Sequence, residues 1–238
     1  MNYAPNAMSV VDRHGWRKYL THSELLRFID AALRQPPERR LFALMLVLTG
    51  CRISEALALT THSFDLEAGF VIIRTLKQRR RKKRSWLFQL VQFFQWVWPW
   101  TKKKKSPPKP PVYRYRWVCL HTSYLQSLQK FFDLGNANAT HERLWAVDRK
   151  TAYRWIKEIM TEADISGPHA HPHAIRHTFA MIHSDEFKTP QSLLQRLMGH
   201  ADSKTTEIYQ QLHGQEELKY MEAMWMKLKI DKRRNFHL

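Results

Sequence analysis

The chain has 238 residues, enough for one domain of ordinary size or for one domain that carries a large insertion. Hydrophobic residues make up 44% of it, which is sufficient for a packed core and excludes a chain disordered throughout. Lysine and arginine number 39 against 21 acidic residues, a formal net charge of +18. The excess is local, because residues 68–132 hold 16 basic residues and no acidic one. Such a stretch favours a polyanion such as DNA as the partner, with an anionic membrane surface as the alternative.

Two cysteines, Cys51 and Cys119, are too few for a disulfide framework, so we expect a reducing, cytoplasmic setting. With DNA as the favoured partner of the basic stretch, the expected location within it is the nucleoid. The N-terminal segment has no long apolar run behind a basic start, and no signal peptide is expected. The sequence contains no P-loop, no zinc-ligand set of cysteines and no dinucleotide fingerprint. We therefore expect neither a metal ion nor an organic cofactor.

The chain begins with a segment, 1–20, that we expect to be an irregular lead-in. Thr21 and Glu24 have the spacing of a capping box, and apolar residues at helical spacing follow them. A helix is therefore predicted from Thr21 until the Pro36-Pro37 pair breaks it.

The next segments show first helix and then strand patterns. A strongly apolar helix is predicted over 41–48, ending at Gly50, and a short helix begins near Ser54. The β-branched run 70–73 follows a glycine and predicts a strand, and 112–120 is its predicted partner strand.

The rest of the chain is mostly helical in pattern. Thr189 and Pro190 predict a helix with a threonine cap and proline at its first position, ending at Gly199. Further helices are predicted over 124–132, 150–162 and 174–183, from near Ser203, and over 216–229. The predicted fold class is α+β, mainly α-helical, with a small antiparallel β-sheet.

The segment between the two predicted strands, about 78–111, has an unusual composition. Behind a basic run, residues 85–101 carry no charge but include seven aromatic side chains, and four lysines and a proline-rich end follow. The uncharged part spans 17 residues, fewer than the roughly 20 that cross a bilayer, and three glutamines interrupt it, so a membrane span is excluded. An insertion that packs locally and one that contacts a partner or a membrane interface remain the alternatives.

Three short strings carry residues suited to phosphate chemistry. Arg52 follows a glycine turn at the start of a short helix in LTGCRISEALAL. His173 and Arg176 lie three residues apart, on one face of a predicted helix, in HPHAIRHTFA. In LMGHADSKTTEIY, His200 follows a turn and Tyr209 lies on the next predicted helix.

Together these strings resemble the tyrosine recombinase family, the phage-type integrases and site-specific recombinases. The arginine box, the His-x-x-Arg box, the Leu-Gly-His turn and the nucleophilic tyrosine of that family have counterparts here, in the same order, over about residues 21–212. Met198 stands where leucine is usual. The resemblance implies the tyrosine-recombinase catalytic-domain fold over 21–238. It also implies DNA cleavage and rejoining through a 3′-phosphotyrosyl intermediate at Tyr209, without metal or ATP.

The resemblance and the chemistry assign a role to each residue. Arg52 and Arg176 would hold the phosphate oxygens, with His200 as a further donor, and His173 would accept the phenol proton. The family places a catalytic lysine in a hairpin turn, and Lys77 is the best match as the acid that protonates the leaving 5′-oxygen. The basic residues that follow are competing candidates for this acid and are expected to track the DNA backbone: Arg79, Arg80, Arg81, Lys82, Lys83 and Arg84.

Each residue also has a structural explanation when it is taken alone. Arg52 could be an ordinary helix-start arginine, Glu55 a surface acid rather than a support for the arginine box, and Tyr209 a half-buried tyrosine. Their occurrence together and in order favours the catalytic interpretation. Two alternative functions share these residues: a type IB topoisomerase, which relaxes supercoiled DNA without a specific site, and a catalytically idle DNA-binding regulator.

The chain departs from the family at its ends. Full-length relatives carry an N-terminal domain that clamps the other face of the DNA, whereas about 20 residues precede the catalytic domain here. We expect either action as the catalytic domain alone or a clamp supplied by an accessory protein. The resemblance implies a homotetramer on two duplexes, and a C-terminal exchange helix at about 215–230. The Met221, Met224 and Trp225 face of that helix is expected to dock on a neighbouring subunit.

Overall fold

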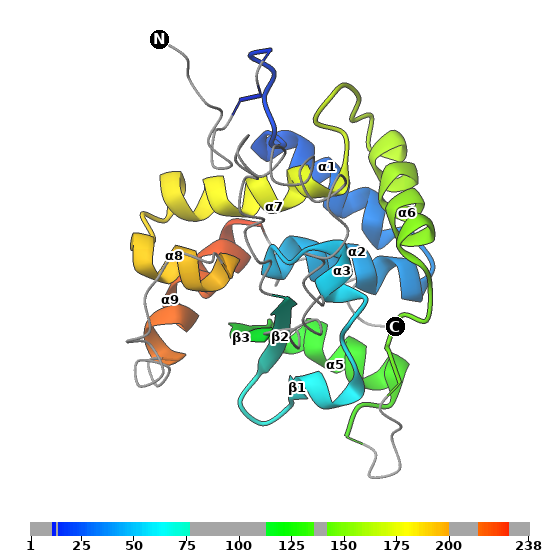
Figure 1. Ribbon diagram of the computed structural model, residues 1–238, viewed down its shortest axis with the longest axis vertical. Helices are drawn as coiled ribbons and strands as arrows, with labels where there is room; N and C mark the ends of the chain where they lie inside the picture. The colour runs from blue at the N-terminus through cyan, green and yellow to red at the C-terminus, as the bar shows by residue number, and fades with distance from the viewer. Residues whose placement is uncertain (1–10, 13, 77–112, 136–141, 200–213, 229–238) are drawn as a thin grey trace, which may run out of the picture. The chain divides into compact units, whose positions relative to one another are not determined.

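The computed structural model describes residues 11–12, 14–76, 113–135, 142–199 and 214–228 (Figure 1). The chain divides into two compact units, one of Met1–Thr75 with Tyr115–Leu238 and one of Leu76–Arg114. The second unit covers the segment predicted to be an insertion, and nearly all of it lies outside the described residues. All helices of the described residues belong to the first unit.

The first unit is mainly helical, with one small sheet. Its helices are α1 (His22–Leu33), α2 (Pro37–Thr49), α3 (Ile53–Ala56), α5 (Thr122–Phe132), α6 (Arg149–Glu162), α7 (Pro172–Met181), α8 (Gln191–Met198) and α9 (Gly214–Lys227), with the short turns η1 (Thr61–Ser63) and η3 (Ile182–Glu186). The strands β1 (Phe64–Asp65), β2 (Phe70–Leu76) and β3 (Tyr113–Cys119) form a sheet in the order β1-β2-β3. β1 and β2 are antiparallel, with Phe64 opposite Val71. This architecture confirms the predicted fold class.

Helix α2 is the centre of the core. It packs against α1, α5 and α7, and every residue from Leu41 to Thr49 is buried (Figure 1). A helix that is apolar on all sides must be enclosed in this way. Two aromatic side chains pack against it and donate their polar hydrogens to its backbone: the Tyr124 hydroxyl lies 2.7 Å from the carbonyl oxygen of Leu41, and Trp145 Nε1 lies 3.1 Å from that of Glu38.

The start signals of the first two helices differ in how well they were predicted. The capping box before α1 is confirmed, because the Glu24 amide donates to Thr21 Oγ1 and the Thr21 amide to the Glu24 carboxylate. The second helix begins earlier than predicted, at Pro37 rather than at Leu41. Proline lacks an amide hydrogen that the first helical turn does not need, so Pro37 begins α2 instead of only ending α1.

The prediction of a Thr189 cap for the next-to-last described helix is wrong. The cap position of α8 belongs to Pro190, and the helix begins at Gln191. Thr189 is buried, its hydroxyl lies 3.1 Å from Nδ1 of His183, and its amide donates to the His183 carbonyl oxygen. The threonine therefore ties α8 to η3, a turn of π-helix that continues α7 beyond its predicted end. The helix predicted near Ser203 lies outside the described residues.

The residues just before α1 are hydrogen-bonded to α7. The Leu20 amide donates to Thr178 Oγ1 at 2.7 Å, and this hydroxyl also lies 3.4 Å from the Leu20 carbonyl oxygen. Arg17 pairs with Glu24 at 2.6 Å, and His169 Nε2 lies 3.4 Å from the same carboxylate. This N-terminal strap, residues 17–20, connects α1 with the helix that carries the His-x-x-Arg box.

The last helix, α9, is folded onto its own chain. Met221, Met224 and Trp225 are all buried, and the Trp225 ring meets the His121 ring edge-on at 5.1 Å. Lys227 pairs with Glu186 of η3. The expected docking of this face on a neighbouring subunit stays a prediction.

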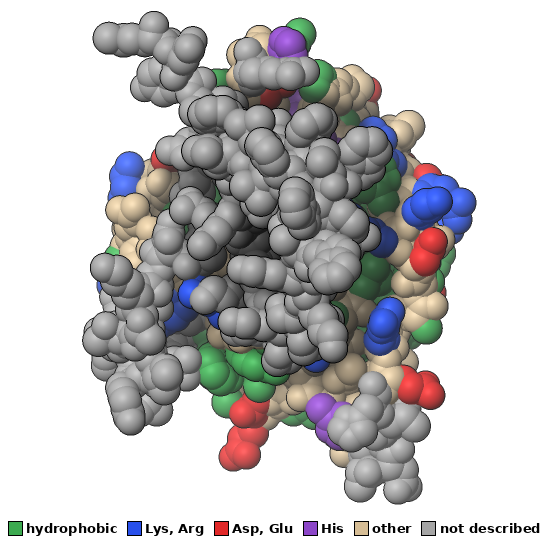
Figure 2. Space-filling view, viewed as in Figure 1, with side chains coloured by type: hydrophobic (Ala, Val, Ile, Leu, Met, Phe, Trp, Pro, Cys, Tyr) green, Lys and Arg blue, Asp and Glu red, His purple; other side chains and the backbone are tan. Residues whose placement is uncertain are grey.

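The surface near α6 carries charges of both signs. Arg34 pairs with Glu162 and Arg39 with Glu158, and Figure 2 shows the alternation of basic and acidic side chains along the edge where α6 lies in Figure 1. In the described part of the chain, no helix is long and apolar enough to span a bilayer.

Candidate active site

Arg52 is placed by the turn that ends α2. Gly50 closes that helix in the left-handed region, at φ 59°, and Arg52 then takes the cap position of α3. The Arg52 amide donates to Oε2 of Glu55 at 2.9 Å, while its Nη1 donates to Oε1 at 2.8 Å. The side chain of Arg52 keeps 39% of its surface exposed, so its remaining N–H groups can reach a ligand in solvent.

Arg176 brings together segments that are far apart in the chain. It projects from α7 and is only 3% exposed. Its Nη1 donates to the Gly50 carbonyl oxygen at 2.7 Å, and its Nη2 donates to the carbonyl oxygen of Met198. Arg176 Nη1 also lies 3.9 Å from the Glu55 carboxylate. The arginine box, the His-x-x-Arg box and the start of the Met-Gly-His turn therefore meet at one guanidinium group.

The carboxylate of Glu55 is the hub of this cluster. Besides the two bonds from Arg52, it accepts one from the Thr75 hydroxyl at 2.9 Å and one from Arg116 Nη2 at 2.8 Å. Burial alone would raise the pKa of Glu55, but Arg116 and the hydrogen bonds outweigh it and hold that pKa at about 2. Glu55 is 5% exposed and is therefore a buried support of the arginine box, not a surface acid.

The charges in the cluster favour an anion. Three guanidinium groups, those of Arg52, Arg116 and Arg176, surround one carboxylate. Burial first, and then the like charge of Arg52, lower the pKa of Arg176 below its usual value, although an arginine stays charged at neutral pH. A site whose own cations are poorly hydrated and repel one another gains free energy when a phosphate group binds.

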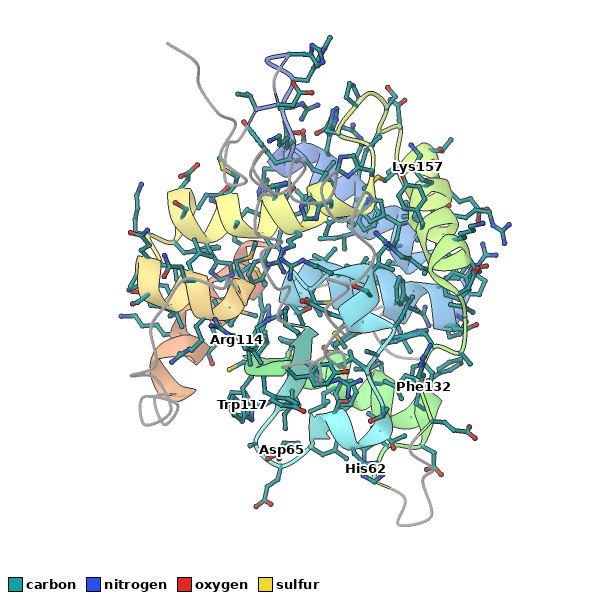
Figure 3. All side chains as sticks on the ribbon, in the orientation of Figure 1. His62, Asp65, Arg114, Trp117, Phe132 and Lys157 are labelled. Carbon is teal, nitrogen blue, oxygen red and sulfur yellow. The ribbon has the colours of Figure 1, made fainter. Side chains whose placement is uncertain are left out.

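His173 lies on the same helix, on the solvent side. Its ring meets that of His177 edge-on at 4.6 Å and stacks on His171 at 6.5 Å. Partial burial first, and then Arg176, His171 and Arg52, lower the pKa of His173, so this ring is neutral at pH 7 and able to accept a proton. Lys157 of α6 (Figure 3) donates to the Ala170 carbonyl oxygen at 2.7 Å and so holds the segment that leads into α7.

The structure thus brings some of the predicted residues together and leaves others undescribed. Arg52 and Arg176 converge on Glu55, and His173 belongs to the same electrostatic cluster. The other predicted site residues fall outside the described residues: Lys77, His200, Tyr209 and the basic residues Arg79–Arg84. Among the described residues there is no cluster of His, Cys, Asp or Glu that could hold a metal ion.

Arg116 and Thr75 also belong to the cluster, although neither lies in one of the three motif strings. The sequence of this strand, YRYRWVC, held a signal, because alternate residues of a strand share a face and the apolar Val118 marks one face as the inner one. That alternation places Arg116 on the inner face with Val118, and an arginine at an inward position requires an acidic partner.

A separate cleft of about 520 Å³ lies on the other face of the sheet. Its lining includes His62, Ile72, Arg74, Tyr115 and Trp117; His62 and Trp117 are labelled in Figure 3. The side chains of β3 that line this cleft point away from Arg116, because successive residues of a strand face opposite sides. The arginine cluster and this cleft are therefore two different features.

Comparison with known proteins identifies the family. A model of the phage integrase family matches residues 18–216. A probable site-specific recombinase in the afa region of Escherichia coli is 29% identical over 188 residues, which cover 76% of this chain and 66% of that protein. The crystal structure of XerA recombinase superposes with a TM-score of 0.54 at 22% identity, covering 88% of this chain and 64% of XerA. XerH site-specific recombinase bound to its difH substrate gives a TM-score of 0.52 at 20% identity, covering 90% of this chain and 59% of XerH.

The chain thus spans about two thirds or less of each of these three relatives. The structural similarity establishes the fold, and the family model extends over most of the sequence. The chain belongs to the phage integrase family, the tyrosine recombinases.

Proposed function

We propose that this chain is a site-specific DNA recombinase that breaks and rejoins DNA strands through a covalent bond to Tyr209. The observation that carries the proposal is the convergence of Arg52 and Arg176 on the Glu55 carboxylate, with Arg176 also bound to the Gly50 and Met198 carbonyl oxygens. Two guanidinium groups at one point can hold the oxygens of a single phosphodiester.

The proposed cleavage step is a transesterification. The phenol oxygen of Tyr209 attacks phosphorus, the bond to the 5′-oxygen breaks, and the strand is retained as a 3′-phosphotyrosyl ester. His173 takes the phenol proton, and Lys77 gives a proton to the departing 5′-oxygen. Because one ester replaces another, the bond energy is conserved and a 5′-hydroxyl can reverse the step.

The two arginines act on the charge of the transition state. As the pentacoordinate phosphorus forms, negative charge gathers on the non-bridging oxygens, and Arg52 and Arg176 offer N–H groups that Glu55 and the two carbonyl oxygens do not use. Removal of one such donor costs about 10²- to 10³-fold in rate in other enzymes. The cluster is held before DNA binds, so no further ordering of these two side chains is needed.

The proposed partner is double-stranded DNA. Of the relatives, XerH has been seen bound to its difH substrate. The basic residues Arg79–Arg84 would follow the phosphate backbone and make the affinity depend on salt. A homotetramer on two duplexes, exchange of the helix that carries Met221, Met224 and Trp225, and an accessory protein that supplies a clamp are part of the same proposal.

The test is covalent capture. Duplexes retained by the protein are selected from a random pool and resynthesised with a nick close to the cleavage position, so that the short strand end diffuses away after attack. We expect a protein–DNA adduct that survives denaturation, is lost in Tyr209→Phe and is digested by protease. The Tyr220→Phe variant, at a tyrosine of α9, is the matched control and should still form the adduct.

The alternatives give different results in the same assay. Relaxation of supercoiled plasmid that lacks the selected sequence would replace the proposal with a type IB topoisomerase. Binding without any adduct would identify a DNA-binding regulator. An adduct that persists in Tyr209→Phe would assign the nucleophile to another residue.

A further inference from the structure

One buried arginine of the cluster has no role in the chemistry proposed above. Arg116 of β3 is 3% exposed, as buried as Arg176, and the mechanism proposed above assigns it no contact with the phosphate. Its guanidinium group faces inward, where Nη2 lies 2.8 Å from Oε2 of Glu55 and Nη1 lies 2.6 Å from the Thr75 hydroxyl.

Thr75 closes a ring of hydrogen bonds. Its hydroxyl accepts from Arg116 and donates to Oε1 of Glu55 at 2.9 Å, so each of the three side chains contacts the other two. The carboxylate then receives four hydrogen bonds, two from Arg52, one from Thr75 and one from Arg116. This number matches the lone pairs of a carboxylate, and Glu55 is held in one orientation.

The turn before His200 packs on the same arginine. Gly199 has a φ of 60°, and a β-carbon added to it would lie 2.7 Å from Nη1 of Arg116 and 3.3 Å from Thr75 Oγ1. Only glycine allows this approach of the turn to the guanidinium group. Arg116 is therefore in contact with the arginine box, with β2 and with the turn that ends α8.

The competition for Glu55 shows what Arg116 does. Oε2 of Glu55 lies 2.8 Å from Arg116 but 3.9 Å from Nη1 of Arg176. Without Arg116, Arg52 still pairs with Oε1 at 2.8 Å, but Oε2 loses its guanidinium partner, and Arg176 is the next cation beside it. A buried carboxylate attracts such a cation strongly. Arg176 would then turn toward Glu55 and away from the phosphate.

We propose that Arg116, together with Thr75, is a positioning residue for phosphate activation, which holds the Glu55 carboxylate so that Arg52 and Arg176 stay directed at the scissile phosphate. This inference rests on the recombinase function proposed above. It assigns Arg116 no contact with DNA. Its effect is on the step in which charge develops on the non-bridging oxygens, and not on affinity for the duplex.

The test compares two substrates with each variant, in single-turnover cleavage at saturating protein. One suicide substrate has the natural phosphodiester, and the other has a methylphosphonate at the scissile position, which lacks the negative charge that the arginines neutralise. For Arg116→Met we expect about a 10²- to 10³-fold loss on the phosphodiester, as for removal of an oxyanion donor, and a loss of less than about tenfold on the methylphosphonate. Arg154→Met, at an exposed arginine of α6, should cleave both substrates like the wild type.

Two variants of Thr75 provide an independent test. They are needed because Arg116→Met leaves a buried carboxylate without one of its partners, and that variant can unfold. Thr75→Val removes the hydroxyl at nearly constant volume, whereas Thr75→Ser retains it. We expect Thr75→Val to lose about tenfold on the phosphodiester and little on the methylphosphonate, and Thr75→Ser to recover the wild-type rate. Melting curves show whether each variant is folded. If Arg116→Met is not folded, the comparison of Thr75→Val with Thr75→Ser tests the inference in its place.

Equal losses on both substrates in a folded variant, which indicate a merely structural role, would overturn the inference, and so would an unchanged rate on the phosphodiester. Weaker DNA binding as the sole defect would also contradict it. Failure of the proposed function itself is distinct, because the wild-type protein would then form no adduct on either substrate.

Discussion

The carbonyl oxygen of Gly50 accepts a hydrogen bond of 2.7 Å from Nη1 of Arg176, a residue 126 positions further along the chain. The same glycine lies in the left-handed region and directs the chain from α2 to Arg52. One backbone turn therefore orients both arginines of the candidate active site.

Gly50→Ala should destabilise the protein by about 2 to 4 kcal/mol. Positive φ costs an alanine about 1 kcal/mol, and the new β-carbon would lie 2.7 Å from the Phe179 ring, which fills a packed core. Gly69→Ala is the matched control, since Gly69 also has a positive φ but open space around it. Urea unfolding of both variants measures the difference, and equal losses would show that the Phe179 contact does not matter.

Arg176→Lys should slow cleavage strongly while DNA binding persists. A lysine ammonium cannot reach the Gly50 and Met198 carbonyl oxygens and also hold two phosphate oxygens in a fork. We expect at least about a 10²-fold loss in single-turnover cleavage. Binding is measured on the same duplex by fluorescence anisotropy, and a loss confined to binding would remove Arg176 from the chemistry.

The pH profile of cleavage should report His173. Its pKa is lowered, so the acid limb should have its midpoint below 6.5, the ordinary value of histidine. His173→Gln should lower the plateau by about 10² and remove that limb, because glutamine cannot accept the proton. His171→Gln is the control, since the neighbouring ring has a lowered pKa but no proposed role. An acid limb that survives in His173→Gln would mean that another group titrates.

His183 should make the folded state sensitive to acid. It is fully buried between Phe179 and Phe187, and burial lowers its pKa to about 4 from an unfolded value of 6.5. Between these values the unfolded chain binds more protons than the folded one, so stability falls as the pH decreases from about 7 toward 4. At pH 5 the loss is about 2 kcal/mol, at roughly 1.36 kcal/mol for each unit of pKa difference. Urea unfolding at pH 7 and 5 checks this value.

In His183→Phe the part of the pH dependence that is due to this residue should disappear. His171→Gln, at a half-buried histidine, is again the control and should keep most of it. If His183→Phe loses as much stability as the wild type over this pH range, the acid sensitivity belongs to other groups.

Local signals in the sequence predicted the helices well. The capping box at Thr21 and the apolar run of α2 each depend only on residues that are close together in the sequence, and both helices are present in the structure. Thr189 has a strong local signal as well, but a buried partner in η3, His183, takes its side chain away from the cap position. A tertiary contact overrides the tendency of a threonine to cap a helix when its hydroxyl would otherwise be buried without a hydrogen bond.

The sequence pointed to the site residues that lie in motifs, but not to Arg116, which contacts the Glu55 carboxylate at their centre. Arg52 and Arg176 lie in recognisable strings, whereas Arg116 meets Glu55 across 61 residues and lies in a strand dense with basic and aromatic residues. Arg116 is one of the basic residues that give the stretch 68–132 its charge, yet its side chain is buried. The catalytic roles of all the site residues stay predictions: Arg52, Lys77, His173, Arg176, His200 and Tyr209.

The N-terminal strap has a practical consequence for biochemical work. Leu20 is hydrogen-bonded to Thr178, which lies on the same helix as Arg176 and His173, so a force applied ahead of residue 17 is transmitted to α7 through this contact. A surface tether or a fused partner that pulls on that end would therefore act on the helix that carries these two residues. Immobilisation through an exposed position on α6, such as Tyr153, leaves this connection unstressed.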